Sequence, residues 1–307
     1  MDQALETEQL NAILDQVATV ADRPRAVEEL SGGLTNRNLK VATPAGVFVV
    51  RQFRGDAALL GIDRDAEHLN SRAAEEAGVG ARVLAYRPDL GLLVISFIDG
   101  VTYDNDSFAA PGVIERVAGA CRALHTGPRF VNDFDMFARQ RGYLKTVHER
   151  GFALFDRYEE FAEQFDTVRS ALAVRDEGTV PCNNDLLAGN FVDDGAKLWL
   201  IDYEYSGNND ACFELGNITT ECDLGADQLE ELVTTYYGRP LRNKIARTRL
   251  QALVSQYGWS LWGAIQAATS PLDFDFDAWG RERFEKAASG FTSTGFSRLI
   301  EEVHRAD

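Results

Sequence analysis

The sequence predicts an α+β protein with two unequal lobes, a small antiparallel sheet followed by a larger, mostly helical part. Short alternating strands joined by turn residues fill the first hundred residues, and apolar patterns of helical period dominate after residue 111. One short β-hairpin interrupts the helices near residue 195. A chain of 307 residues also exceeds the size of a usual single hydrophobic core. We therefore expect an N-terminal domain at residues 1–99 and a C-terminal domain at residues 100–307.

The first lobe is expected to begin with a helix at 4–20, because apolar residues recur there on one helical face. Two hairpins follow, since Pro-Ala-Gly at 44–46 and Pro-Asp-Leu-Gly at 88–91 are turn sequences between apolar strands. The remaining elements expected in this lobe are strands at 39–43, 47–53, 83–86 and 92–97 and one helix at 63–77.

The second lobe is expected to be helical around one β island. Asp194-Gly195 is a strong signal for a tight hairpin turn, and it is flanked by strand patterns at 191–193 and 198–201. The helices predicted from apolar periodicity are at 112–125, 151–173, 226–237, 243–268 and 280–304.

The charge balance points away from nucleic acid and toward cations. The chain has 31 Lys and Arg against 48 Asp and Glu, a formal net charge of −17. A nucleic-acid-binding protein needs a basic face, whereas an acidic protein attracts cations as substrate or metal. Solubility alone is a plainer explanation of the same charge.

Composition also bears on the compartment. No apolar run reaches the length of about 18 residues that a membrane-spanning helix needs, so we expect no membrane insertion. The N-terminus lacks a basic segment followed by an apolar core, and the four cysteines form no C-x-x-C pair. We therefore expect a cytoplasmic protein with reduced thiols.

The predicted hairpin brings oxygen-bearing side chains to one end. Asn190 precedes its first strand and Asp202 follows its second strand, while Asp185 lies five residues before Asn190. Glu204 follows Asp202 closely. Such a group of hard oxygen ligands suits Mg²⁺, and a carboxylate that the metal does not need can orient an alcohol and accept its proton. Each residue alone could equally cap a turn, so the argument rests on their combined spacing.

The first lobe contains the partners that a phosphate group needs. Backbone N–H groups of a glycine turn can approach phosphate, although an ordinary turn is an equally simple explanation. This turn contains Ser31, Gly32, Gly33 and Thr35. Arg51 lies among apolar strand residues and needs a partner, for which Glu67 on the next helix is the candidate. A plain salt bridge would satisfy the same two residues.

These motifs resemble the choline/ethanolamine kinase family, in its bacterial LicA-like branch, within the protein-kinase-like superfamily that includes aminoglycoside phosphotransferases. The resemblance covers nearly the whole chain. The matching segments are the glycine turn and Asn-Arg-Asn at 32–38, Val-Arg at 50–51, Ala-Glu-His at 66–68, Phe-Asp-Met-Phe at 134–137, Asn-Asp-Leu-Leu at 184–187 and Leu-Ile-Asp-Tyr-Glu-Tyr-Ser-Gly at 200–207. The resemblance implies a protein-kinase-like bilobal fold with ATP between the lobes.

The resemblance also implies roles for individual residues. Asp185 matches the catalytic aspartate of the family. Metal ligation falls to Asn190, Asp202 and the neighbouring Glu204. Nucleotide binding falls to the glycine turn, Arg51 and Glu67, and to Phe97 and Ile98, which stand where the family holds adenine.

An aromatic run near the C-terminus resembles the choline-binding helix of the family. Three of the four tryptophans lie between residues 259 and 279, and aromatic faces attract a quaternary ammonium by about 0.5–2 kcal/mol per contact. A packed aromatic core is the alternative explanation. We expect Asp185 and a cage of aromatic residues to bind the acceptor, the cage members being Tyr205, Trp259, Trp262, Trp279 and Phe274.

The expected activity is ATP- and Mg²⁺-dependent phosphorylation of a small cationic amino alcohol, with choline as first candidate. Ethanolamine, an aminoglycoside or another hydroxylated amine is the alternative acceptor. Two departures from the family motifs motivate a third possibility, a ligand-binding pseudokinase. Asn183 stands where the family usually has a loop-bracing His, and Glu214 replaces an Asp in the Phe-Asp-Leu motif.

Overall fold

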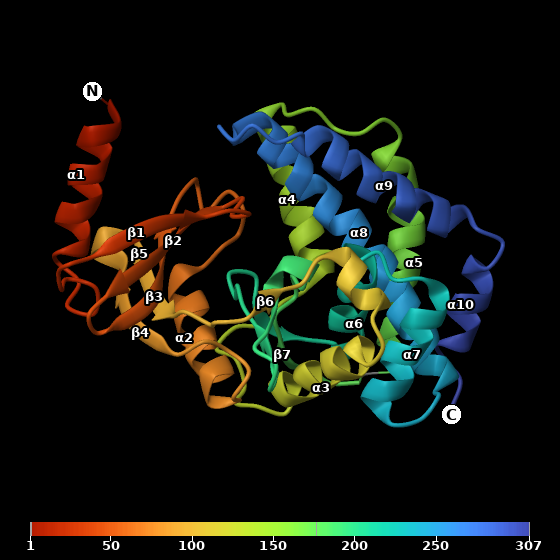
Figure 1. Cartoon of the computed structure of the whole chain (residues 1–307). Coiled ribbons are helices and arrows are strands. Elements are labelled where there is room, and N and C mark those ends of the chain that lie inside the picture. The colour runs from red at the N-terminus through yellow and green to blue at the C-terminus, as the bar shows by residue number, and fades with distance from the viewer. Residues whose placement is uncertain (1, 176, 307) are drawn as a thin grey trace.

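The computed structural model describes residues 2–175 and 177–306 and shows two lobes, which Figure 1 presents side by side. The first lobe contains a five-stranded antiparallel sheet with strand order β1-β2-β3-β5-β4. Its elements are α1 (Asp2–Leu14), β1 (Ala26–Leu30), β2 (Asn36–Thr43), β3 (Gly46–Phe53), α2 (Arg64–Glu76), β4 (Val83–Arg87) and β5 (Leu92–Ser96).

The β2–β3 hairpin sets which residues of the sheet face the second lobe. Its register pairs Thr43 with Gly46 across the predicted turn. Val41 and Val50 are fully buried and pack in a cluster with Leu14 from the end of α1. Because successive strand residues point to opposite faces, burial of Val50 directs Arg51 to the other face of the sheet.

Helix α2 lies next to this sheet and brings an acidic side chain under it. The Asp63 side chain caps the helix by accepting backbone N–H bonds from Asp65 and Ala66, both at 3.0 Å. Glu67 is only 1% exposed, so its carboxylate requires a cationic or hydrogen-bonding partner. Arg64 is that partner, with a hydrogen bond to Glu67 Oε2 at 2.7 Å, and Arg51 lies farther away, 3.5 Å from Glu67 Oε1.

Within the described residues, the second lobe packs eight helices around two small sheets. The helices are α3 (Val113–His125), α4 (Met136–Arg150), α5 (Ala162–Ala173), α6 (Ala211–Glu221), α7 (Ala226–Tyr237), α8 (Arg242–Thr269), α9 (Phe276–Thr292) and α10 (Phe296–Glu302). The sheets are β7–β10 and β6-β8-β9, formed by β6 (Val101–Thr102), β7 (Val180–Cys182), β8 (Phe191–Asp193), β9 (Leu198–Leu200) and β10 (Gly207–Asn209). Short 3-10 helices are η1 (Pro88–Leu90), η2 (Asn105–Ala109), η3 (Tyr158–Phe161) and η4 (Ala188–Asn190).

The predicted fold class and hairpin are confirmed, but several helix predictions were wrong. The helix expected at 151–173 exists only from Ala162 onward, because Gly151 adopts a left-handed conformation that ends α4. The helix expected at 280–304 is broken at Ser293 into α9 and α10. Helices α4 and α6 were not predicted at all, since their mixed polar and apolar sequences lack a clear period.

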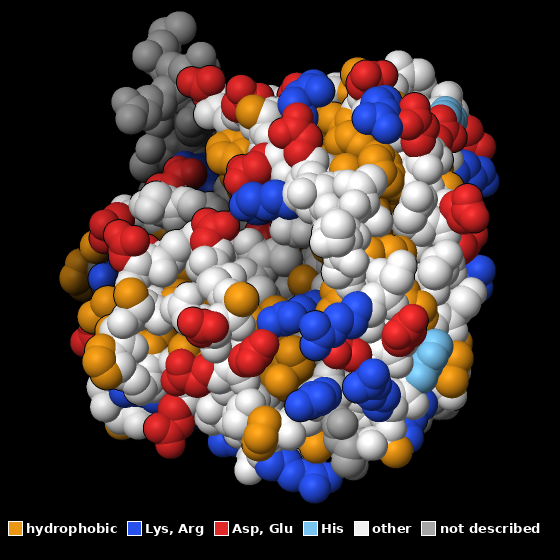
Figure 2. Space-filling view, turned by 90° about the vertical axis from the view of Figure 1, so that its right-hand side faces the viewer, with side chains coloured by type: hydrophobic (Ala, Val, Ile, Leu, Met, Phe, Trp, Pro, Cys, Tyr) orange, Lys and Arg blue, Asp and Glu red, His pale blue; other side chains and the backbone are white. Residues whose placement is uncertain are grey.

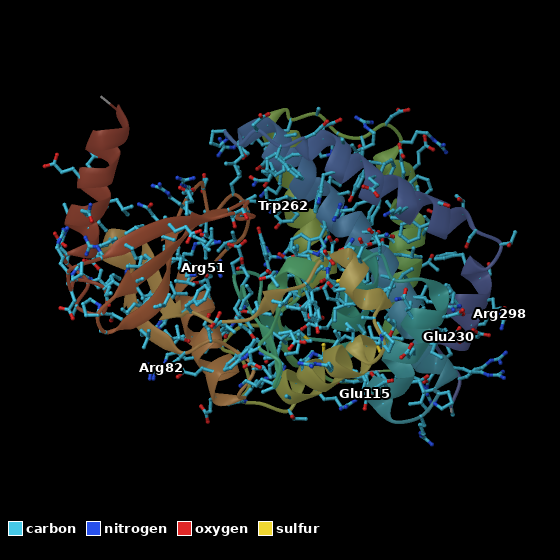
Figure 3. All side chains as sticks on the ribbon, in the orientation of Figure 1. Arg51, Arg82, Glu115, Glu230, Trp262 and Arg298 are labelled. Atoms are coloured by element: carbon cyan, nitrogen blue, oxygen red, sulfur yellow. The ribbon has the colours of Figure 1, made fainter. Side chains whose placement is uncertain are left out.

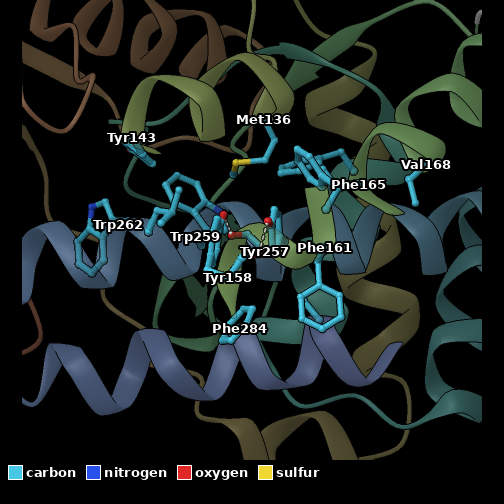
Figure 4. Close-up of a cluster of buried hydrophobic side chains, with 14 of the residues drawn as sticks. Met136, Tyr143, Tyr158, Phe161, Phe165, Val168, Tyr257, Trp259, Trp262 and Phe284 are labelled. Carbon is cyan, nitrogen blue, oxygen red and sulfur yellow. Dashed lines mark hydrogen bonds between the residues drawn. The ribbon is translucent and has the colours of Figure 1, made fainter. Parts of the chain in front are cut away.

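Helix α8 forms the axis of the larger core. Most of its length is buried, and its apolar residues pack against α4, α5 and α9 in one cluster. Figure 4 shows Trp262 at one end of this cluster, away from Phe161 and Val168. The core therefore continues up to the place where α8 approaches the first lobe.

The surface agrees with the acidic composition. Figure 2 shows acidic side chains scattered over one face of the molecule with Lys and Arg side chains between them. All four cysteines are buried and unpaired by disulfides. Across the described ranges 2–175 and 177–306, no helix combines the length and apolar character needed to cross a membrane.

Candidate active site

The β8–β9 hairpin joins the three predicted oxygen-bearing residues. Phe191 pairs with Leu200, so Asn190 and Asp202 lie at the same open end of the hairpin. The backbone N–H of Ile201 donates to the Asn190 carbonyl at 3.0 Å. The Asn190 side-chain amide then donates to the Asp185 carbonyl at 2.7 Å. All three residues line one cavity of about 530 Å³.

This cavity lies between the lobes. Figure 3 shows Arg51 on the sheet and Trp262 on the helical lobe, on the sides of the two lobes that face each other. The first lobe contributes to the cavity wall the residues of the glycine turn, Ser31, Gly32, Gly33 and Thr35. The second lobe contributes Tyr205 and three tryptophans, Trp259, Trp262 and Trp279.

Electrostatics in the cavity favour a bound cation. Burial raises the pKa of Asp185, and the negative charges of Glu221, Asp202 and Glu204 raise it further. Arg283 opposes this shift only in part. Several carboxylates that raise one another's pKa are stabilised by a positive charge placed among them, which is the role that a metal ion or a cationic substrate can fill.

The donor set fits Mg²⁺ at Asn190 and Asp202. The nitrogen of the Asn190 amide is already used on the Asp185 carbonyl, which leaves the amide oxygen as the atom for a metal. The Asp202 side chain is 26% exposed, and Arg51 contacts its Oδ1 atom at 2.6 Å. Mg²⁺ needs few protein ligands and takes its remaining ligands from water and phosphate.

Glu204 has a different environment from these two residues. Its carboxylate accepts hydrogen bonds from Thr35 at 2.6 Å, from Asn36 at 2.9 Å and from Arg64 at 3.2 Å. Burial, with the nearby charge of Asp202, raises the pKa of Glu204 to about 7. In this arrangement Glu204 connects the glycine turn and the start of α2 to the second lobe, so metal ligation would require it to exchange these partners.

Arg51 lies at the junction of the lobes. Its Nη2 atom lies 3.5 Å from Glu67 and 2.6 Å from Asp202. Burial alone would lower the pKa of Arg51, but the carboxylates around it hold the pKa above its ordinary value. The guanidinium is therefore charged and lies next to the Asp202 carboxylate, where nucleotide phosphates are expected.

The aromatic wall depends on a close approach of α8 and α9. A Cβ atom on Gly263 would lie 2.7 Å from the Gly280 Cα atom, so only glycine allows this contact. Trp262 and Trp279 directly precede these glycines, and their ring centroids are 5.1 Å apart. The Trp262 indole N–H donates to the Tyr205 hydroxyl at 2.7 Å, which fixes both rings beside the cavity.

Among the cavity residues that the sequence analysis missed, Glu221 and Arg283 form an ion pair. Glu221 ends α6, and Arg283 on α9 binds both of its carboxylate oxygens. The Arg283 guanidinium also lies 3.4 Å from the centre of the Trp279 ring. The spacing of four residues between Trp279 and Arg283 was a usable helical signal, whereas nothing near Glu221 in the sequence indicated its place.

Five predicted site residues lie outside the cavity wall. Of the described residues that line the cavity, none is Arg51, Glu67, Phe97, Ile98 or Phe274. Phe97 follows β5 and lies under the Lys40 ammonium, which is 4.3 Å from the ring centre. Phe274 is 42% exposed and contacts Phe276, because the chain at 270–275 is a loop before α9.

Comparisons with known proteins identify the family to which this chain is similar. The model of the choline/ethanolamine kinase family matches residues 27–237. A probable ethanolamine kinase from Arabidopsis thaliana is 27% identical over 284 residues, covering 82% of this chain and 75% of the relative.

Two solved structures extend the comparison. A choline/ethanolamine kinase family protein from Mesorhizobium loti has 32% identity and a TM-score of 0.85, covering 97% of this chain and 99% of the other. The fold of choline kinase LicA from Streptococcus pneumoniae is also similar, with 23% identity and a TM-score of 0.79 over 92% of this chain and 99% of that one. Since the family model spans more than half of the sequence, this chain belongs to the choline/ethanolamine kinase family, whose members are phosphotransferases that act on an alcohol group.

Proposed function

We propose that this protein transfers the terminal phosphoryl group of ATP to the hydroxyl group of choline, with Mg²⁺ as the required metal. One observation carries the proposal: a single cavity is lined by Asp185, Asn190 and Asp202 and also by Tyr205 and three tryptophans. A phosphate-binding end and a site for an organic cation are therefore adjacent.

The residues divide the chemistry among them. Asp185 orients the acceptor hydroxyl and accepts its proton, and its raised pKa makes the carboxylate a better proton acceptor. Asn190 and Asp202 would hold Mg²⁺, which neutralises charge on the phosphate oxygens. Arg51, which already lies beside Asp202, adds a positive charge at the same place.

The state of the carboxylates favours choline over ethanolamine. A primary ammonium must donate hydrogen bonds, whereas a trimethylammonium group has no N–H and is recognised by aromatic faces and net negative charge. Glu221 is already bound through both oxygens by Arg283, and Glu204 by donors of the first lobe. The cavity thus offers negative charge and aromatic faces but few free carboxylate oxygens to a primary ammonium.

An acceptor panel with coupled ADP detection tests the proposal. The panel contains choline, ethanolamine and kanamycin, each with ATP in the presence of Mg²⁺ and after chelation with EDTA. We expect the kcat/KM for choline to exceed that for ethanolamine by at least tenfold and all turnover to stop without metal. Preference for ethanolamine or kanamycin would reassign the acceptor, and ATP binding without turnover of any acceptor would indicate a pseudokinase.

A further inference from the structure

The two turns that present Asp185 and Asp202 share an uncommon backbone conformation. Asn184, directly before Asp185, has φ 69°, and Asp202 itself has φ 65°. A non-glycine residue in this left-handed region is uncommon and has to be held in place by its surroundings. Whatever holds these two turns also sets the position of the proton acceptor relative to the proposed metal ligand.

One side chain reaches both turns. The Asn183 amide nitrogen donates to the Asp202 carbonyl at 2.8 Å and to the Ile201 carbonyl at 3.1 Å. Its amide oxygen accepts the backbone N–H of Asp185 at 3.1 Å. Asn183 is fully buried, so water does not compete for these bonds. A single planar group therefore connects segments that are 17 residues apart in the sequence (185 to 202).

Asn183 is itself held from behind by a buried carboxylate. Glu214 on α6 accepts the backbone N–H of Asn183 at 2.8 Å and that of Asn184 at 2.6 Å. Glu214 is fully buried, and His125 lies 3.6 Å from its Oε1 atom. These bonds fix the backbone from which the Asn183 amide projects, so the amide has little freedom to release either turn.

We propose that Asn183 is a positioning residue that couples the Asp185 turn to the Asp202 turn. This proposal rests on the proposed function, because it assigns catalytic importance to the distance between these turns. A carboxamide has two N–H donors and one oxygen acceptor, which match the two carbonyls and the one N–H found here. A neutral imidazole has only one donor and one acceptor, so the His common at this position in the family could hold only one of the two carbonyls.

The substitution N183D tests the coupling with almost no change of shape. It replaces the two N–H donors by a carboxylate oxygen, which repels the carbonyls of Ile201 and Asp202. The control is N208D, because the Asn208 amide is also buried and also binds backbone carbonyls, those of Phe130 at 2.9 Å and Asn132 at 2.8 Å, in addition to the Asp133 carboxylate at 3.1 Å. The control therefore removes a similar set of buried hydrogen bonds that does not involve Asp185 or Asp202.

We expect N183D to lower kcat by about 100-fold while the KM of the acceptor changes by less than about threefold, since the aromatic wall is untouched. The kcat of N183H should be at least about tenfold higher than that of N183D, and the kcat of N208D should stay within about threefold of wild type. An equal loss in N183D and N208D, or a kcat of N183D within threefold of wild type, would overturn the proposal.

Hydrogen–deuterium exchange provides a readout that does not depend on activity. In N183D and N183H, backbone amides at 183–187 and at 201–205 should exchange faster together, whereas N208D should affect only 128–134 and 206–210. Faster exchange at 183–187 alone would refute the coupling. If wild type does not phosphorylate choline, the proposed function fails, but this exchange comparison still decides whether Asn183 links the two turns.

Discussion

Trp262 provides the most direct test of cation recognition in the cavity. Its side chain is 5% exposed, its indole N–H is bound to Tyr205, and its ring packs against Trp279. The substitution W262L replaces the ring by an apolar side chain without a π face. W262F keeps a π face but removes the hydrogen bond to Tyr205.

The expected magnitude follows from two separate losses. A cation–π contact contributes about 0.5–2 kcal/mol, which corresponds to roughly 2- to 30-fold in kcat/KM because about 1.4 kcal/mol is tenfold. Loss of the hydrogen bond to Tyr205 costs about 0.5–1.5 kcal/mol and affects charged and uncharged acceptors alike. The comparison of two acceptors therefore isolates the first loss.

The assay compares choline with 3,3-dimethylbutan-1-ol, in which a carbon atom replaces the charged nitrogen. We expect W262L to lower the ratio of the two kcat/KM values about tenfold and W262F to leave it nearly unchanged, with the KM for ATP within about twofold in both. An unchanged ratio in W262L would show that this ring contributes packing only and would refute the cage.

Three further predictions concern catalysis, pH and packing. D185N should lower kcat by at least about 1,000-fold while its melting temperature stays within about 3 °C of that of wild type. Substantial residual turnover would contradict the role assigned to Asp185. Burial raises the pKa of Glu204 from 4.5 to about 7, so the folded protein holds this proton more tightly than the unfolded chain. The stability that the protonated Glu204 contributes is therefore complete below about pH 4.5 and is lost as the pH rises through about 7. Between about pH 5 and pH 7, the free energy of unfolding of the ligand-free protein should therefore decrease less steeply with pH in E204Q than in wild type. Denaturation at several pH values measures this, and equal slopes in the two proteins would contradict the prediction. G263A should destabilise the protein by about 1–3 kcal/mol because its methyl group meets Gly280, whereas G142A, on an exposed part of α4 with open space around it, should be neutral or stabilising by up to about 1 kcal/mol in the same denaturation experiment.

The sequence was sufficient to predict that Asp185, Asn190 and Asp202 lie close together, while their roles remain proposals. Asp194-Gly195 specifies a tight hairpin, and a hairpin necessarily places Asn190 and Asp202 at one end. Asp185 is close enough in the sequence to be carried to the same place. The prediction worked because the constraint spans fewer than twenty residues.

Residues that reach the cavity through tertiary packing could not be placed in this way. Glu221 and Arg283 occupy polar positions on separate helices, and only the packing of α6, α8 and α9 brings them together. Phe274 shows the converse, since an aromatic residue close to Trp279 in the sequence lies on an exposed loop. The break of the last predicted helix at Ser293 has a local origin instead, because Thr-Ser-Thr-Gly at 292–295 is a turn sequence and the Ser293 hydroxyl donates to the Gly290 carbonyl at 2.8 Å.

The central claim is that Asn190 and Asp202 hold a metal ion beside the terminal phosphate of a nucleotide and next to Asp185. A crystal structure with Mn²⁺ and a non-hydrolysable ATP analogue tests it most directly, because the anomalous signal locates the metal. The account predicts a Mn²⁺ peak directly coordinated by the Asn190 amide oxygen and by an Asp202 carboxylate oxygen, with the γ-phosphate in the same cavity. A metal bound elsewhere, or a nucleotide outside this cavity, would contradict it.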